Sequence, residues 1–203
     1  MSVTMEYKKF FIFPLTNINL FPNTTKPLNI FESRYIEMVN QSITLGVPIA
    51  LCFVPEESTE IRAIAGFSIP QVIERRPDGS LLIFMAGQGK VLLDLSSVKT
   101  ENTVMSMSGN VITEDKILDD SLKSKYVALS EVLVRWVSKH VTDSYQREVF
   151  VRSLIGPQEV IGAFAAYLIY DYDLQYEIME LNSLNDQIKF LYRLFESGKL
   201  TNV

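Results

Sequence analysis

Short apolar runs separated by turn-forming residues dominate the first half of the chain, which is typical of β-strands. Four segments have this pattern: 8–15, 48–55, 60–98 and 102–112. In the third, Pro77, Asp78 and Gly79 separate two β-rich runs, and Asp78-Gly79 is expected to supply the left-handed geometry of a hairpin turn. In the fourth, Met105 and Met107 alternate with serines and therefore share one face of a strand.

One helix interrupts these strands at residues 33–46. Four residues at helical spacing share one face: Tyr35, Met38, Val39 and Ser42. We expect Ser33 to cap the start of this helix and Gly46 to end it.

The second half changes to a helical period. Apolar side chains recur every three or four residues over 118–140. Asp143 has the spacing of a helix cap, Pro157 suits a first helical position, and Ser183 precedes a last helix that stops at Gly198. These patterns predict an α+β chain, with a β-rich barrel or sandwich at 1–114 followed by a helical part at 115–203, joined by an acidic linker.

Length, charge and cysteine content narrow the class of protein. The 203 residues suit one large or two small domains. The net charge of −5 argues against nucleic-acid binding, which uses basic surfaces. Cys52 is the only cysteine, so an intrachain disulfide is excluded. With no secretory signal and no apolar stretch long enough to span a membrane, the sequence predicts a soluble cytoplasmic protein.

The segment "LFPNTTKPLNIFESRY" at 20–35 combines prolines, aromatic residues and charges. We interpret it as a structural corner between strand and helix, with direct ligand contact as the alternative. Pro27 forces an extended entry into the corner. Phe31 and Tyr35 lie four residues apart and are expected to stack on one helix face, while Glu32 and Arg34 satisfy the backbone or each other.

The same segment resembles the start of the Lon protease N-terminal domain family. The matching residues are Phe13-Pro14-Leu15, Leu20-Phe21-Pro22 and the run from Pro27 to Tyr35. Ala65-Gly66, the turn at 77–79, Gly87 to Lys90, Pro157 and the last helix are similar as well. The chain departs from the family at Asn23, Asn29 and Ser33, where glycine, arginine and proline are common.

The resemblance implies a PUA-like β pseudo-barrel followed by a helical bundle, in a divergent, stand-alone member of the family. In the complete protease this domain is thought to hold substrate chains and help assembly. The ATPase and peptidase lie further along the polypeptide, and this chain ends at Val203, before either could begin.

Nothing in the sequence indicates catalysis, a cofactor or a metal site. The run "FMAGQGKV" fails the P-loop pattern, because Phe84 and Val91 stand where glycine and Ser/Thr are required. His140 is the only histidine and is interpreted as a packing or capping residue, while Cys52 is interpreted as a buried apolar residue. We therefore expect an ATP-independent protein that is not an enzyme.

The leading hypothesis is a module that binds unfolded or extended polypeptide, with an adaptor role in protein quality control and a full-length protease as a further partner. Phe21, Met105 and Met107 are candidate peptide contacts, with core packing as the alternative for each. The competing hypothesis is a PUA-like module that binds RNA or a small molecule. Neither hypothesis involves a membrane.

Overall fold

The computed structural model describes residues 7–198. It divides the chain into two compact units, 1–112 and 113–203. The first contains the described strands and one α-helix, and the second contains the other α-helices, so the expected β barrel followed by a helical region is confirmed. The division falls two residues before the boundary that the sequence suggested, 114/115.

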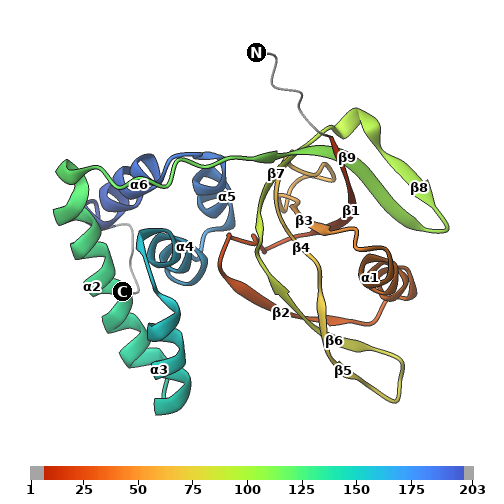
Figure 1. Ribbon diagram of the computed structural model, residues 1–203, viewed down its shortest axis with the longest axis horizontal. Helices are drawn as coiled ribbons and strands as arrows, with labels where there is room; N and C mark the ends of the chain where they lie inside the picture. Colours follow the sequence, from red (N-terminus) through yellow and green to blue (C-terminus); the bar gives the residue numbers. More distant parts are fainter. Residues whose placement is uncertain (1–6, 199–203) are drawn as a thin grey trace. The chain divides into compact units, whose positions relative to one another are not determined.

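The first unit holds two sheets and one long helix (Figure 1). Its elements are β1 (Lys8–Leu15), β2 (Thr25–Ile30), α1 (Ser33–Leu45), β3 (Ile49–Phe53), β4 (Ile64–Ser68), β5 (Gln71–Arg75), β6 (Leu81–Ala86), β7 (Gly89–Leu93), β8 (Lys99–Glu101) and β9 (Val104–Ile112). One sheet runs β1-β3-β4-β7-β9-β8, and a further pairing of β1 with β9 closes its first five strands into a barrel. The other sheet runs β2-β6-β5.

Strands β1 and β3 are buried on both faces, because each lies between two hydrophobic cores. Phe10 and Ile12 of β1 belong to a core to which all five barrel strands contribute, which is the barrel interior. Phe11 and Phe13 belong to a second core, shared with α1, β2 and β6. A strand that is apolar on both faces has no alternation to read, so it appears in the sequence as a continuous apolar run.

The Leu20-Phe21 segment packs backbone to backbone against two glycines. A Cβ at Gly66 would lie 1.8 Å from the carbonyl oxygen of Leu20, and one at Gly87 would lie 2.2 Å from that of Phe21. The backbone N–H of Gly87 also donates to the Thr24 carbonyl at 2.8 Å. Glycine is required at both positions, because only its hydrogen side chain fits in the space between the two backbone segments.

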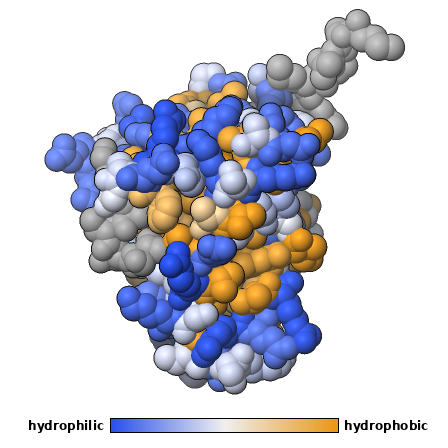
Figure 2. Space-filling model, turned by 90° about the vertical axis from the view of Figure 1, so that its left-hand side faces the viewer, coloured by the Kyte–Doolittle hydropathy of each residue, from blue (hydrophilic) through white to orange (hydrophobic). Residues whose placement is uncertain are grey.

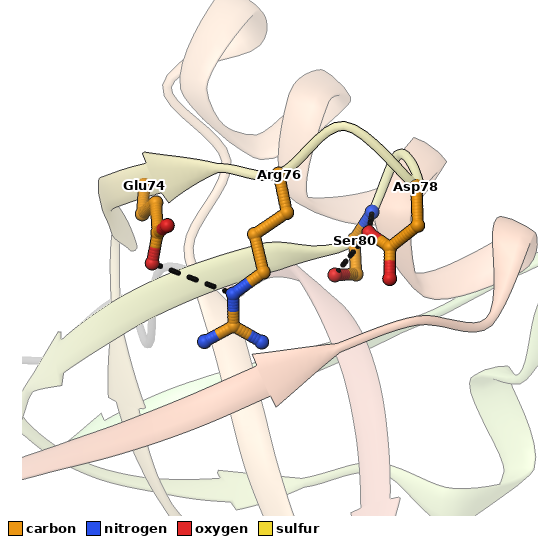
Figure 3. Close-up of polar contacts among 4 residues, drawn as sticks. All are labelled: Glu74, Arg76, Asp78 and Ser80. Carbon is orange, nitrogen blue, oxygen red and sulfur yellow. Dashed lines mark hydrogen bonds and ion pairs between the residues drawn. The ribbon is translucent and has the colours of Figure 1, made fainter.

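The turn between β5 and β6 is stabilised by its own polar groups (Figure 3). The Asp78 carboxylate accepts hydrogen bonds from the backbone N–H and the hydroxyl of Ser80, at 2.9 and 2.7 Å. These bonds from Ser80 lower the pKa of Asp78. Gly79 has a φ of 86°, while Asp78 is not among the positive-φ residues, so the left-handed geometry comes from the glycine. Glu74 and Arg76 form an ion pair beside the turn at 3.4 Å.

The second unit is a bundle of five α-helices within residues 113–198, preceded by a single 3₁₀ turn at Asp120–Leu122. The helices are α2 (Lys123–His140), α3 (Ser144–Ser153), α4 (Pro157–Leu168), α5 (Tyr172–Glu180) and α6 (Leu184–Glu196). Helices α2, α4 and α6 pack against one another. Ala163, Ala165 and Ala166 are buried in α4, and such small side chains let neighbouring helices approach closely.

The helix ends follow the sequence signals in part. Gly46 ends α1 with a φ of 67°, and Asp143 caps α3 by accepting from the Gln146 N–H at 2.7 Å, as expected. The expected cap at Ser33 is wrong, because Ser33 is the first residue of α1 and the cap position belongs to Glu32. Ser183 occupies the cap position of α6 but makes no side-chain bond there.

The segment expected to be an acidic linker is tied to α6. The Asp115 N–H donates to the Asn182 carbonyl at 2.9 Å, and the Asp115 carbonyl accepts from Leu184 at 2.8 Å. The Asn185 side chain bonds both the Ile117 carbonyl and the Asp119 N–H, each at 2.9 Å. The acidic segment that joins the two parts is therefore hydrogen-bonded to the helical unit at the start of α6.

Candidate functional site

The corner between β2 and α1 is held by three of the residues that the sequence singled out. The Tyr35 ring packs against Phe13 of β1 with centroids 4.4 Å apart. The Arg34 guanidinium lies 4.6 Å from the Tyr35 ring centre and 2.8 Å from the Glu32 carboxylate. Partial burial raises the pKa of the Tyr35 hydroxyl. This contact anchors the start of α1 to the barrel wall, which supports the structural interpretation of the corner.

Phe31 does not take part in that packing, so the expected stack on Tyr35 is wrong. Its side chain is 76% exposed. The reason is local: Phe31 lies before the cap residue Glu32 and continues the extended alternation of β2, in which Ile30 points into the core. The next residue along an extended chain points the opposite way.

Phe31 extends a row of outward-facing residues on β2, and β6 carries a second row beside it. In the β2–β6 pairing, Pro27 lies opposite Phe84 and Asn29 lies opposite Leu82. Phe84 is 37% exposed, while its neighbours Ile83 and Met85 are buried. Directly opposed residues point to the same side of a sheet, so these side chains share one surface.

Strand β5 completes this surface. Its pairing with β6 shifts register between Val72 and Glu74, so Ile73 occupies a bulge. Val72 packs against the second core, and Ile73 is 45% exposed. We call the resulting surface the apolar sheet face. Its apolar members are Pro27, Phe31, Ile73, Leu82 and Phe84, and by the same pairing the polar residues Asn29, Gln71 and Glu74 lie among them.

The backbone edges of this sheet are less suited than its face to binding another chain. Pro27 lies within the edge strand β2 and has no N–H to donate. The bulge at Ile73 interrupts β5, the other edge, and Glu74 and Arg75 add charges there. Bulges and charged residues are the usual means of blocking edge pairing. Side-chain contact on the face is therefore the better candidate for recognition.

The candidate peptide contacts Phe21 and Met107 are core residues. They are 3% and 6% exposed, and Met107 lies in the barrel interior with Met105 packed against the same core. The expected alternation of β9 is present, but the shared face of the two methionines points inward. This corrects the expectation that these side chains are available to a peptide; core packing, the alternative, is what the structure has.

Cys52 and His140, the two residues that the sequence analysis considered as reactive groups, belong to different units. Cys52 is fully buried, and this burial raises the pKa of its thiol to about 12. His140 belongs to the second unit, where its Nδ1 lies 2.9 Å from the Trp136 carbonyl oxygen. Within residues 7–198, no group of three or more His, Cys, Asp or Glu side chains is placed to hold a metal ion. In the same range, no helix has the length and apolarity needed to cross a membrane.

The second unit also exposes apolar side chains, on α2 and α3. Val127, Val134, Tyr145 and Val149 are each at least 43% exposed. Figure 2 looks onto this side of the unit, where apolar side chains gather between hydrophilic ones. Three of these four residues are valines, whereas the apolar sheet face has two phenylalanines, and aromatic anchors are enriched among residues that dominate binding energy.

The sequence did not identify Ile73, Leu82 and Phe84 as residues of an exposed apolar surface. Leu81 to Ala86 is apolar throughout, although alternate residues are exposed. A run without polar residues predicts a strand that is buried on both faces. The sequence of β6 therefore does not show that one of its faces is exposed. The available signal was the neighbouring β2, where Thr25 and Asn29 mark the outward side.

Comparison with known proteins agrees with this fold. A family model described as the ATP-dependent protease La (LON) substrate-binding domain matches residues 9–197. A Lon N-terminal domain protein from Xanthomonas campestris is similar in structure, with a TM-score of 0.68 and 15% identity over 92% of this chain and 98% of that chain. The N-terminal domain of the Mycobacterium avium complex Lon protease has a TM-score of 0.69 and 11% identity over 93% of this chain and 98% of that chain.

No curated protein sequence matches the chain significantly. The likeness to the solved structures, at such low identity, establishes the fold alone. The family model, by contrast, spans nearly all of the residues that the structure describes. The chain therefore belongs to the family of Lon protease substrate-binding domains.

Proposed function

We propose that the apolar sheet face binds extended or unfolded segments of other polypeptides. The observation that carries the proposal is the exposure of Phe31, at 76%, next to a strand whose outward residues include Phe84. Exposed apolar side chains that recur over one surface are a usual mark of a binding face. The family description of a substrate-binding domain supports the same assignment.

The physical basis is the burial of apolar surface. Covering one phenylalanine side chain stabilises a complex by about 1.5–3 kcal/mol, and the contact has no directional requirement. Unfolded chains expose apolar residues that folded proteins bury, so an exposed apolar face discriminates between the two states. Holding such a chain requires no bond to be made or broken.

The chain in this proposal is a binding module and not an enzyme. We infer a cytoplasmic adaptor in protein quality control, which passes bound polypeptide to a full-length protease. The absence of a disulfide, since Cys52 is the only cysteine, supports the reducing compartment. Co-purification of the chain with a full-length protease in the presence of unfolded polypeptide tests the adaptor role; failure to co-purify would remove it and leave polypeptide binding intact.

The binding proposal is tested by comparing one polypeptide in two states. Fluorescently labelled α-lactalbumin, reduced and carboxyamidomethylated, serves as the unfolded ligand, and the oxidised protein serves as the folded control. Fluorescence anisotropy gives the dissociation constants. The account predicts saturable binding of the unfolded form and at least about tenfold weaker binding of the folded form, which corresponds to about 1.4 kcal/mol.

Two substitutions locate the binding surface. Phe31→Ser removes the most exposed aromatic residue of the apolar sheet face, and Tyr145→Ser removes an aromatic residue of α3 with nearly the same exposure, 75%. We expect F31S to weaken binding about tenfold, in line with the loss of one partly buried aromatic contact, and Y145S to leave it unchanged. Equal effects of the two substitutions, or an effect of Y145S alone, would move the site away from the sheet.

A further inference from the structure

A cavity of about 560 Å³ lies in the second unit beside the C-terminal half of α2. Its described lining includes Arg135, Trp136, Lys139 and His140 of α2 and Phe195 of α6. It is therefore formed within one unit and shares no residue with the apolar sheet face. Its volume is in the range that holds small molecules.

The rim of the cavity is cationic. Arg135 and Lys139 lie four residues apart on α2 and are both exposed. Among residues 7–198, neither makes an ion pair or a hydrogen bond to another side chain, whereas Lys123 on the same helix pairs with Asp120 at 2.7 Å. The two side chains therefore place two positive charges at the rim of the cavity.

The aromatic wall of the cavity is fixed by stacking. The Trp136 indole stacks on the His140 ring at 4.7 Å and on Tyr167 of α4 at 6.3 Å. Phe150 of α3 meets Tyr167 edge-on at 5.6 Å. Trp136 is thus packed between His140 on its own helix and Tyr167 of α4, and a rigid aromatic wall loses little conformational entropy when a ligand packs against it.

Trp136 also carries an unsatisfied donor. Its indole Nε1 is buried and has no hydrogen-bond partner among the described residues. Leaving such a group unpaired costs about 1–3 kcal/mol.

The helix dipole explains the positions of only some of these cationic side chains. Lys139 and His140 lie in the last turn of α2, where cationic side chains offset the negative end of the helix dipole. Arg135 lies one turn earlier, where this effect has faded. The dipole also gives no account of the cavity or of the unpaired indole N–H.

We propose that this cavity binds a small organic anion, in which a carboxylate or phosphate is joined to a flat apolar group. Arg135 and Lys139 hold the anionic group, since guanidinium and ammonium groups are the usual ligands of such oxygens. Trp136 and Phe195 contact the apolar group. The site is independent of polypeptide binding by the apolar sheet face, and either proposal can fail without the other.

The single tryptophan makes the proposal testable, because Trp136 is the only one in the chain. Its indole ¹H–¹⁵N resonance is followed by NMR during titration with phenyl phosphate. Inorganic phosphate and benzyl alcohol carry the two halves of that probe separately. For a probe of this size we expect a dissociation constant on the order of 1 mM, and at least about fivefold weaker binding of each separate half.

Charge-neutralising variants identify the residues responsible. R135Q and K139Q are each expected to weaken phenyl phosphate binding about five- to tenfold, as for the loss of one charge-assisted contact at an accessible site. K123Q, on the same helix but outside the cavity, is the matched control and leaves binding unchanged. Thermal unfolding of each variant separates a loss of binding from a loss of fold.

Two results would overturn the proposed site as a whole, and a third would remove the role of its cations. One is the absence of a saturable shift of the Trp136 resonance with phenyl phosphate up to about 10 mM, ten times the expected constant. The other is a shift of equal size and midpoint in R135Q, K139Q and the unsubstituted chain. Equal binding of benzyl alcohol and phenyl phosphate would likewise contradict a role for the cations.

Discussion

At the scale of single residues, the direction in which the backbone turns a side chain decides its role. Ile30 and Phe31 are neighbours and both apolar, yet one is 2% exposed and the other 76%. Tyr35 anchors the helix that follows them by packing on Phe13. Residue types alone could therefore indicate that the corner has a structural role. They could not show that the Phe31 side chain is exposed instead of packed in that corner.

Cys52 gives a prediction about pH. Its thiol keeps its proton in the folded chain up to a pKa of about 12, whereas an unperturbed thiol has the value 9.0. A raised folded pKa contributes stability that is fully present below pH 9 and is lost as the pH rises toward 12. Between pH 8 and 10, the unsubstituted chain should lose about 1.4 kcal/mol more unfolding free energy than Cys52→Ala.

Urea unfolding of both proteins at pH 8 and pH 10 measures this difference. Buried thiols are also expected to be inert, so a thiol reagent should label Cys52 only after unfolding. Parallel loss of stability in the two proteins, or rapid labelling under native conditions, would show that Cys52 is not enclosed in the barrel.

Gly66 gives a prediction about packing. A methyl group there would meet the Leu20 carbonyl oxygen at 1.8 Å, and backbone atoms have no room to give way. We expect Gly66→Ala to lower the unfolding free energy by about 3 kcal/mol or more, as for severe overpacking. Gly79→Ala is the control, since nothing lies within 4 Å of its Cβ and only its φ of 86° is strained. It should cost about 1 kcal/mol. If the two substitutions lowered the unfolding free energy equally, a small backbone shift would be enough to make room for a methyl group at position 66.

At the scale of elements, the sequence was informative wherever local chemistry fixes the structure. Periodicity located α1 and the helices of the second unit, Gly46 and Gly79 have the positive φ that turns require, and Pro157 begins α4. The signals failed where tertiary partners decide. Ser33 has the chemistry of a cap but is the first residue of the helix, and the hydrogen bonds of the acidic segment to the start of α6 depend on residues far along the chain.

The caps of α3 and α6 give a matched pair of substitutions. Asp143 accepts a bond from the Gln146 N–H, so Asp143→Ala should cost about 1 kcal/mol of unfolding free energy. Ser183 makes no side-chain cap bond, so Ser183→Ala should change stability by less than about 0.5 kcal/mol. Denaturant midpoints of the two variants provide the comparison; a cost for S183A equal to that for D143A would contradict these assignments.

At the scale of the whole chain, resemblance carried information that periodicity did not. The motif at 20–35 pointed to the barrel of the Lon substrate-binding family, and its Leu20-Phe21 pair is now explained by the close approach to Gly66 and Gly87. Neither source located the apolar sheet face. That surface depends on the register between β2 and β6 and on the bulge in β5, which are long-range features.

The cavity beside α2 could not be found from the sequence for a similar reason. Arg135, Lys139 and His140 are recognisable as a basic helix end, but Phe195 comes from a distant segment. What makes the site a candidate is the cavity between these residues, with Arg135 and Lys139 at its rim, which only the packed structure shows.

The most direct test of the central claim is photo-crosslinking from a single position. A photoreactive phenylalanine analogue replaces Phe84 in one protein and Tyr145 in another, and each is irradiated with unfolded and with folded α-lactalbumin. If the apolar sheet face holds unfolded chains, position 84 crosslinks to the unfolded form and position 145 does not. Crosslinks at position 145 alone, or none at position 84 while binding persists, would show that polypeptide is held elsewhere on the molecule.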